Sequence, residues 1–117
     1  MIRDMETEIT QTNYLSDKVF RVVAQSIEGE ILDPAKTWLK VYLRAGDRVF
    51  AAVNDPAGEN INCEIDGNAL LVTVPGKRLG HGKVEFMFEV REIDDRFADG
   101  YLNTYSTEWK QTNIIIV

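Results

Sequence analysis

Few side chains in this sequence could perform catalysis by themselves. His81 is the only histidine, and it lies between Gly80 and Gly82. Catalysis by histidine requires a carboxylate that orients the ring and a nucleophile within reach, and the neighbouring residues supply neither. We therefore interpret His81 as part of an exposed turn in which the two glycines supply positive φ values.

The single cysteine, Cys63, excludes an intrachain disulfide and cannot form a zinc site alone. It lies between Asn62 and Glu64 in an alternating segment. A reactive thiolate would need a cationic neighbourhood, which this acidic stretch does not offer. We expect Cys63 to be a small buried apolar side chain.

Three aspartates gather between the last strands, at Asp94, Asp95 and Asp99. Carboxylate oxygens are ligands that suit calcium, so a calcium site is one interpretation of this loop. The spacing lacks the alternating ligands and the distal glutamate of an EF-hand. We therefore predict a solvated loop with no metal, and keep calcium as the alternative.

Paired carboxylates are the other acid–base chemistry to consider. Glu85 and Glu89 share one face of an expected strand, and Asp95 follows them. Along a strand the two glutamates are separated by roughly 13 Å. Catalytic carboxyl pairs in glycosidases are closer than this. We predict no catalytic residue and no cofactor, and an enzyme is the third and weakest of the functional hypotheses.

Aromatic residues are the remaining candidates for function. Trp38 and Tyr42 fall on the same side of an alternating segment, and Trp109 follows later. Such rings usually belong to a core or its rim, but on an outer sheet face they form an interaction patch. We therefore take Trp38, Tyr42 and Trp109 as possible interface residues. A carbohydrate-binding module would stack sugars on these rings and on Tyr101 and Tyr105.

Composition restricts the partners. The chain has 117 residues, enough for one domain with its own core. It is 44% hydrophobic and 27% charged, which argues against a disordered chain. The net charge of −6 disfavours a nucleic-acid partner. The polar N-terminus and the lack of a long apolar run predict neither a secretory signal nor a membrane span, and hence a cytoplasmic protein at synthesis.

The elements that would position these residues all have the period of β-strands. Leu39, Val41 and Leu43 alternate with polar or amphipathic neighbours. Val84, Phe86, Phe88 and Val90 alternate in the same way and predict a core face, opposite a mostly solvated face. We expect strands at 19–25, 37–44, 48–53, 61–65, 69–74, 83–93 and 112–117, with 101–107 either a short strand or a loop.

These strands predict an all-β domain, an immunoglobulin-like antiparallel β-sandwich of about seven strands at 18–117. A small barrel is the alternative. Asp66-Gly67-Asn68 predicts a tight hairpin turn. The aliphatic run 114–117 must pair centrally or be covered by a partner. Residues 1–17 form a polar arm, with one short strand or helical turn at most.

Several landmarks occur in a fixed order along the chain, and together they carry a resemblance. They are Ile27-Glu28-Gly29-Glu30, Leu39-Lys40-Val41-Tyr42-Leu43, Leu70-Leu71-Val72-Thr73-Val74, Leu79-Gly80-His81-Gly82-Lys83-Val84 and Phe97-Ala98-Asp99-Gly100. The pattern at 18–117 resembles small immunoglobulin-like domains of phage and prophage tail modules. It is similar to the N-terminal domain of upper baseplate proteins and to short virion-type proteins of Bacteroides prophages.

The resemblance implies a non-enzymatic structural protein of a phage tail, a baseplate or fibre adaptor that acts through protein–protein contacts. Its partners would be other tail or baseplate proteins or further copies of itself, and its location the virion. That family has no catalytic residues to carry over. These 117 residues contain no fibre or coiled-coil sequence, which favours an adaptor or a lone module. The alternative function is a carbohydrate- or cell-surface-binding β-sandwich module.

Overall fold

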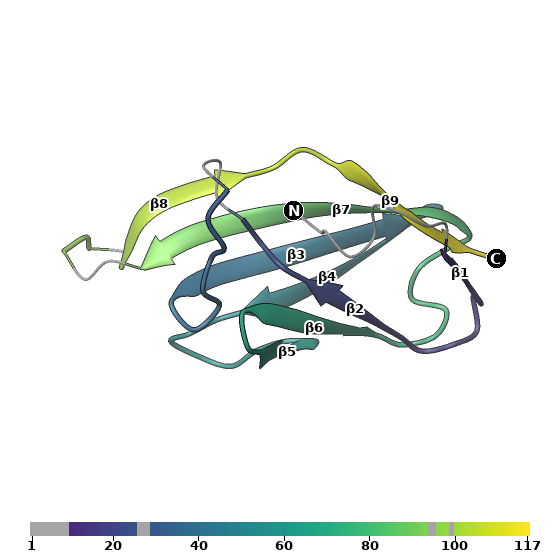
Figure 1. Ribbon diagram of the computed structural model, residues 1–117, viewed down its shortest axis with the longest axis horizontal. Helices are drawn as coiled ribbons and strands as arrows, with labels where there is room; N and C mark the ends of the chain where they lie inside the picture. Colours follow the sequence, from purple (N-terminus) through teal and green to yellow (C-terminus); the bar gives the residue numbers. More distant parts are fainter. Residues whose placement is uncertain (1–9, 26–28, 94–95, 99) are drawn as a thin grey trace.

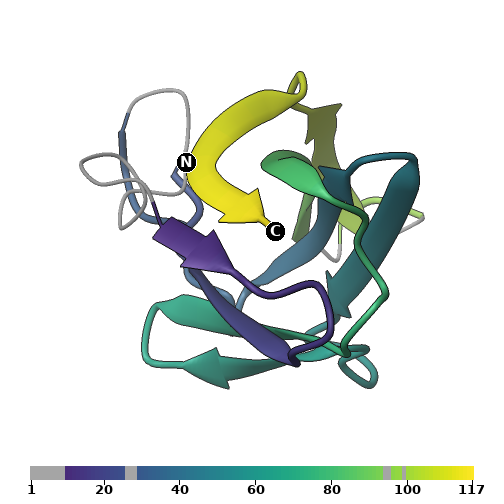
Figure 2. The same cartoon turned by 90° about the vertical axis from the view of Figure 1, so that its right-hand side faces the viewer.

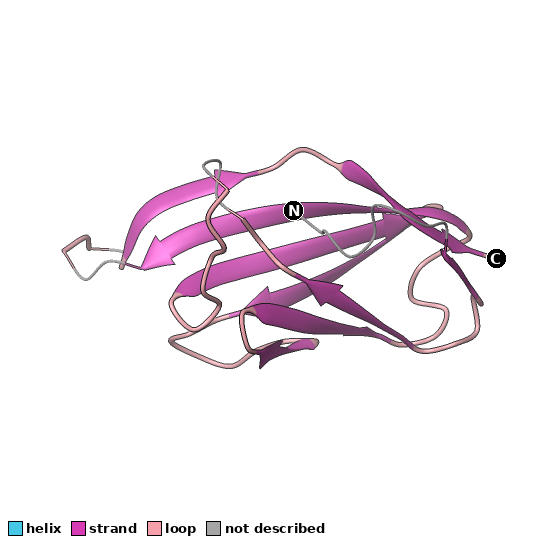
Figure 3. Ribbon diagram, in the orientation of Figure 1, coloured by secondary structure: helices cyan, strands magenta, loops and turns pink. Residues whose placement is uncertain are grey.

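The computed structural model describes residues 10–25, 29–93, 96–98 and 100–117, and these ranges contain only β-strands and loops (Figure 3). The prediction of an all-β protein is confirmed. Nine strands are formed in the described ranges, against about seven expected. They are β1 (Thr10–Thr12), β2 (Lys18–Val22), β3 (Thr37–Ala45), β4 (Arg48–Asn54), β5 (Cys63–Asp66), β6 (Ala69–Val74), β7 (Gly82–Ile93), β8 (Tyr101–Ser106) and β9 (Lys110–Ile116).

The strands form two sheets in a β-sandwich-like arrangement (Figure 1). The larger sheet has the order β1-β9-β7-β3-β4, and β8 also pairs with β7; the smaller sheet has the order β2-β6-β5. Viewed end-on, the larger sheet curves over the smaller one (Figure 2). Neighbouring strands are antiparallel as expected, except that β1 runs parallel to β9.

The core lies between the two sheets and follows the predicted alternation. Every second residue of β3, from Thr37 to Ala45, is buried, and the residues between them are half-buried. Phe86 and Phe88 of β7 are 4% and 3% exposed, and their rings lie 5.3 Å apart. A fully buried apolar side chain of this size contributes about 1.5–3 kcal/mol by leaving water. Apolar burial therefore fixes which face of β3 and β7 points outward.

Two glycines allow close turns, for different reasons. Gly67 has a φ of 60° in the two-residue loop Gly67-Asn68, which joins β5 to β6 within the predicted tight turn. A Cβ on Gly80 would lie 2.8 Å from the carbonyl oxygen of Ala45, whose oxygen accepts a hydrogen bond from the Gly80 amide. Gly80 is thus required by close packing, and the expectation of positive φ is met by Gly82 at 120°.

Both ends of the described chain join the larger sheet. Strand β9 lies between β1 and β7, so the aliphatic C-terminal run pairs centrally, as its composition requires. The amide of Tyr14 donates to the Val117 carbonyl, and the Tyr14 ring stacks on His81 with 4.4 Å between ring centroids. Residues 10–17 of the expected arm are therefore docked on the sheet, whereas residues 1–9 lie outside the described ranges.

A buried amide anchors the loops at the far end of β4. Asn54 is fully buried, and its Nδ2 donates to the carbonyl oxygens of Pro34 and Thr37 at 2.7 and 2.9 Å. Its Oδ1 accepts a hydrogen bond from Asn60. A buried polar side chain is tolerated when its hydrogen bonds are made in this way. Asn54 thus ties the segments before β3 and after β4 to the end of the sandwich.

Candidate interaction surface

The outward side chains of β3 and β7 meet in four rows. The antiparallel register pairs Trp38 with Arg91, Lys40 with Glu89, Tyr42 with Met87 and Arg44 with Glu85. Trp109, just before β9, contacts the same side. We call these nine residues the aromatic face: Trp38, Lys40, Tyr42, Arg44, Glu85, Met87, Glu89, Arg91 and Trp109.

One end of the aromatic face is organised around the Arg44 guanidinium. Its central carbon lies 4.1 Å from the centroid of the Trp109 ring, while its Nη2 lies 3.1 Å from Oε1 of Glu85. Tyr42 meets Trp109 edge-on, with 6.5 Å between centroids and 68° between ring planes. Arg44 therefore holds a ring from the β9 side of the sheet against β3, across the intervening β7.

The other end repeats the same chemistry. The guanidinium of Arg91 lies 4.3 Å above the Trp38 ring and 3.1 Å from Oε1 of Glu89. The ammonium of Lys40 lies 4.8 Å from the Tyr42 ring centroid, and the Tyr42 hydroxyl donates to Glu89 at 3.4 Å. All three candidate aromatic side chains thus have a cation over one ring face.

The prediction that Glu85, Met87, Glu89 and Arg91 form a mostly solvated face is wrong. All four are half-buried, and the charged side chains in the two ion pairs are only 25–36% exposed. The reason is that long side chains lay their apolar stems along neighbouring rings while their charged ends pair with each other. The outer surface of the larger sheet is therefore already ordered in the isolated chain.

The same contacts limit the chemistry that is available on this surface. Glu85 and Glu89 are held by Arg44 and Arg91, on different rows, and do not converge on a common point. Stacking a sugar needs a free aromatic face, and one face of each ring is occupied by a cation. A protein surface can instead cover the ring edges together with the charged ends around them.

The other residues singled out in the sequence lie away from the aromatic face. His81 is exposed at the turn before β7, against Tyr14. Cys63 is half-buried against the core, and its Sγ donates to the Val53 carbonyl at 3.3 Å. Burial raises the pKa of the Cys63 thiol, which favours its protonated form over the reactive thiolate. These contacts support structural roles for both residues.

The calcium hypothesis concerns residues that the structure does not describe. Asp94, Asp95 and Asp99 lie outside the described ranges, as do the side chains of Tyr101 and Tyr105. Within the described ranges, no three His, Cys, Asp or Glu side chains gather in a way that could hold a metal ion. The same part of the chain has no helix with the length and apolar character of a membrane span.

Sequence patterns identified the rings of the aromatic face but missed the charged residues that hold them. The alternation at 38–44 places Lys40 and Arg44 beside Tyr42, and this was the available signal. The outward pairs of β3 and β7 join residues from 41 positions apart, at Arg44 and Glu85, to 53 positions apart, at Trp38 and Arg91, which no local pattern specifies.

Comparison of the chain with known protein families, with curated proteins and with solved structures gives no match.

Proposed function

We propose that this protein is a non-enzymatic structural component of a phage or prophage tail, a baseplate or fibre adaptor that works through protein–protein contacts. The proposal joins two supports. One is the resemblance of residues 18–117 to immunoglobulin-like tail domains. The other is the aromatic face, which supplies a surface suited to such contacts. On this account the protein is made in the cytoplasm and ends in the virion.

The observation that carries the proposal is the composition of the aromatic face. Protein interfaces are enriched in Trp, Tyr, Met and Arg, and their energetic centres in Trp, Tyr and Arg. The aromatic face has two Trp, one Tyr, one Met and two Arg among its nine residues. Its three cations and two carboxylates leave it near neutral, although the whole chain carries −6. This composition supports protein contact as the role of this sheet face.

Strand order supports the immunoglobulin-like part of the proposal. In immunoglobulin variable-type domains, strands G, F, C and C′ share one sheet and strands B, E and D are found in the other. The orders β9-β7-β3-β4 and β2-β6-β5 follow the same sequence of neighbours. The chain departs from antibody domains in having no cysteine pair and in turning Trp38 outward from its strand.

The proposal is tested by complex formation with tail proteins encoded beside this gene. Each neighbour is co-expressed with the chain and the mixture is separated by size-exclusion chromatography. We expect co-elution with at least one baseplate or fibre protein. We expect the complex to be lost in Trp109→Ala and kept in Val19→Ala, whose side chain is on the outer face of the smaller sheet. Neighbours of unrelated function, or complexes indifferent to Trp109→Ala, would contradict the proposal.

A further inference from the structure

In three of the four rows of the aromatic face, charge is sorted by strand. Strand β3 carries the cations Lys40 and Arg44, and β7 carries the carboxylates Glu89 and Glu85 directly opposite them. The row between them, Tyr42 and Met87, is uncharged. These three rows therefore present two parallel columns of opposite charge, and the fourth row adds the cation Arg91 on β7 beside Trp38.

These charged groups can still make contacts outside the chain. The Arg44, Glu85, Glu89 and Arg91 side chains remain 25–36% exposed. A guanidinium has five donor hydrogens and a carboxylate about four acceptor positions, more than one ion pair uses. Partly covered charges of this kind can accept a second partner of opposite sign across an interface.

We propose that a second copy of this chain covers the aromatic face, related by a two-fold axis that runs parallel to the strands between β3 and β7. This inference rests on the proposed function, because it names the first partner of the same surface. The axis places β3 over the partner's β7. Lys40 then lies over the partner's Glu89, Arg44 over the partner's Glu85, and Tyr42 over the partner's Met87.

The arrangement of charges also favours this axis over a two-fold axis that runs across the strands. A two-fold axis running across the strands through the Tyr42 row would place β3 over the partner's β3. Arg44 would then face the partner's Lys40, and Glu85 would face the partner's Glu89. Like charges brought together in an interface are strongly unfavourable. A closed dimer with parallel strands pairs Lys40 and Arg44 with the partner's Glu89 and the partner's Glu85, and it places Arg91 over the partner's Trp38.

The strands that flank β3 and β7 fit the same arrangement. Ala51 and Val49 of β4 lie in register with Tyr42 and Arg44 and point to the same side. The axis brings β4 over the partner's Trp109, which stands beyond β7 at the level of these two rows. The small side chain of Ala51 leaves room for an indole ring. Val49, which is 55% exposed in the single chain, would be covered.

The molecule is large enough for such an interface. Its principal extents are 47, 27 and 25 Å, so each long side exceeds the roughly 800 Å² per partner that a standard interface buries. Two twisted sheets pack face to face at about 30° to each other, which keeps rows at equal heights opposed near the axis. Strands β3 and β7, which carry eight of the nine residues of the aromatic face, are the strands nearest the proposed axis.

Sedimentation equilibrium with charge-reversed variants tests the proposal. We expect wild type to be a monomer–dimer mixture whose dissociation increases with salt. The acidic double variant, Lys40→Glu with Arg44→Glu, and the basic double variant, Glu85→Lys with Glu89→Lys, should each associate at least about tenfold more weakly. An equimolar mixture of the two should associate again, because each acidic column meets a basic one. Circular dichroism shows whether each variant is folded.

A matched control uses the smaller sheet. Glu64→Lys with Asp66→Lys makes the same change of charge on exposed residues of β5, and should leave the dimer as strong as wild type. Wild type that stays monomeric to about 1 mM, the weak limit of ordinary association, overturns the proposal. Folded charge variants that associate like wild type, or a mixture that stays monomeric, overturn it too.

Chemical cross-linking tests the axis. In a Cys63→Ser background, Ala51→Cys and Glu108→Cys proteins are mixed and treated with a bismaleimide that spans about 10 Å, the spacing of sheets packed face to face. We expect the mixed product, because the axis brings β4 over the segment that precedes the partner's β9. Ala51→Cys alone should cross-link poorly. Efficient cross-linking of Ala51→Cys alone, with no mixed product, would place β4 over the partner's β4 and overturn the proposed axis.

The two proposals fail in different ways. A monomeric wild type that forms a Trp109-dependent complex with a tail protein would overturn self-association and leave the tail function standing. A charge-sorted dimer that forms no complex with any neighbouring tail protein would support self-association and contradict the tail function.

Discussion

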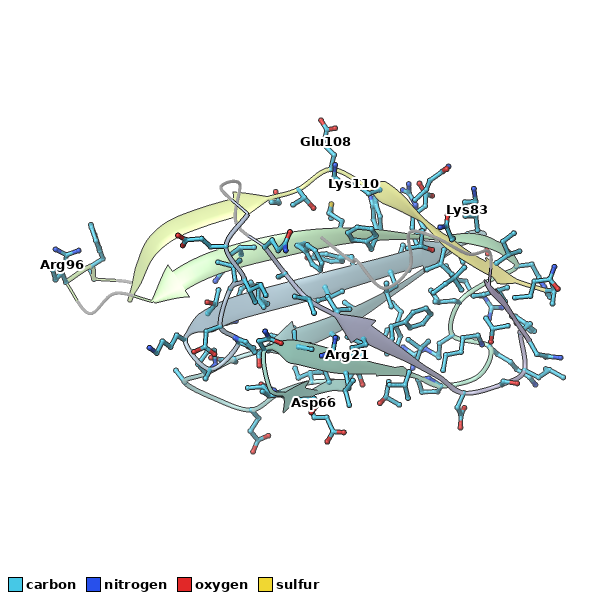
Figure 4. The ribbon with its side chains drawn as sticks, viewed as in Figure 1. Arg21, Asp66, Lys83, Arg96, Glu108 and Lys110 are labelled. Atoms are coloured by element: carbon cyan, nitrogen blue, oxygen red, sulfur yellow. The ribbon has the colours of Figure 1, made fainter. Side chains whose placement is uncertain are left out.

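The two sheets expose outer faces of different character. On the smaller sheet the outward residues Val19 and Thr73 are exposed, Val19 by 63%, and they are paired across β2 and β6. On the larger sheet the outward residues of β3 are half-buried throughout. Figure 4 shows Glu108, the neighbour of Trp109, and Asp66 of β5 on opposite sides of the ribbon. The outer surface of the larger sheet is therefore held by contacts among its side chains, whereas the outer surface of the smaller sheet is an ordinary solvated face.

This difference shows that side chains of this chain are also held in place outside the core. Both sheets already bury their inner faces, with Val72 and Val84 fully buried from opposite sides of the core. The stack of Arg44 on Trp109 lies outside that core, where it adds to stability and fixes several rotamers at the surface. Fixing rotamers before binding lowers the entropy lost on association. We propose that the ordered outer face serves binding in addition to its contribution to stability.

The largest expected contrast is between Trp109 and Val19. Trp109→Ala removes a half-buried ring with its Tyr42 and Arg44 contacts, and should lower the free energy of unfolding by about 2 kcal/mol. Val19→Ala changes an exposed side chain and should stay within about 0.5 kcal/mol of wild type. Urea unfolding measures both, at a concentration where the chain is monomeric. Equal effects would remove the distinction between the two faces.

A smaller effect is expected at Arg44. Arg44→Met keeps the apolar stem but removes the ion pair with Glu85 and the cation over Trp109, and should cost about 1 kcal/mol. Arg44→Lys keeps the charge without the planar group and should recover only part of the loss. Thr73→Ala on the smaller sheet serves as the control. Full recovery by lysine would show that charge alone, without stacking, orders this end of the face.

A still smaller effect on the free energy of unfolding is expected from the contact between Trp38 and Arg91. A double-mutant cycle with Trp38→Leu and Arg91→Met should give an interaction energy of about 0.5–1 kcal/mol. The same cycle at Val19 and Thr73, which also face each other across two strands, should give a value near zero. Thermal or urea unfolding supplies the four free energies of each cycle. A coupling as small at Trp38–Arg91 as at Val19–Thr73 would break the comparison.

The smallest expected effect is on the rate of alkylation of Cys63, which lies on β5, an edge strand of the smaller sheet. Its raised pKa leaves less thiolate at a given pH than a free cysteine has, so alkylation at pH 8 should be slower than that of the urea-unfolded chain. Because the folded pKa is higher, the folded rate should still be rising at a pH where the unfolded rate has levelled. Mass spectrometry follows the reaction. Equal alkylation rates in the folded and the urea-unfolded chain would show that the fold does not protect the Cys63 thiol.

Local patterns predicted the strands well, because burial at every second position repeats within each strand. The alternation at 37–44 and 83–93 gave the core faces of β3 and β7. Strand β1 was not specified, since its three residues carry no apolar pattern and pair only with β9. The contacts between β3 and β7 depend on a register between distant segments. Single residues of the candidate surface could thus be predicted, but not the rows that they form.

We propose that the aromatic face, and not the outer face of the smaller sheet, is the surface through which this protein binds proteins. Hydroxyl-radical footprinting tests it directly, since Trp38, Tyr42, Met87 and Trp109 are readily oxidised. Dilute and concentrated protein are labelled and compared by mass spectrometry. We predict that oxidation of these four side chains falls on concentration while that of Leu71, on the smaller sheet, is unchanged. Association with unchanged oxidation of the four, or with protection of Leu71, would contradict the account.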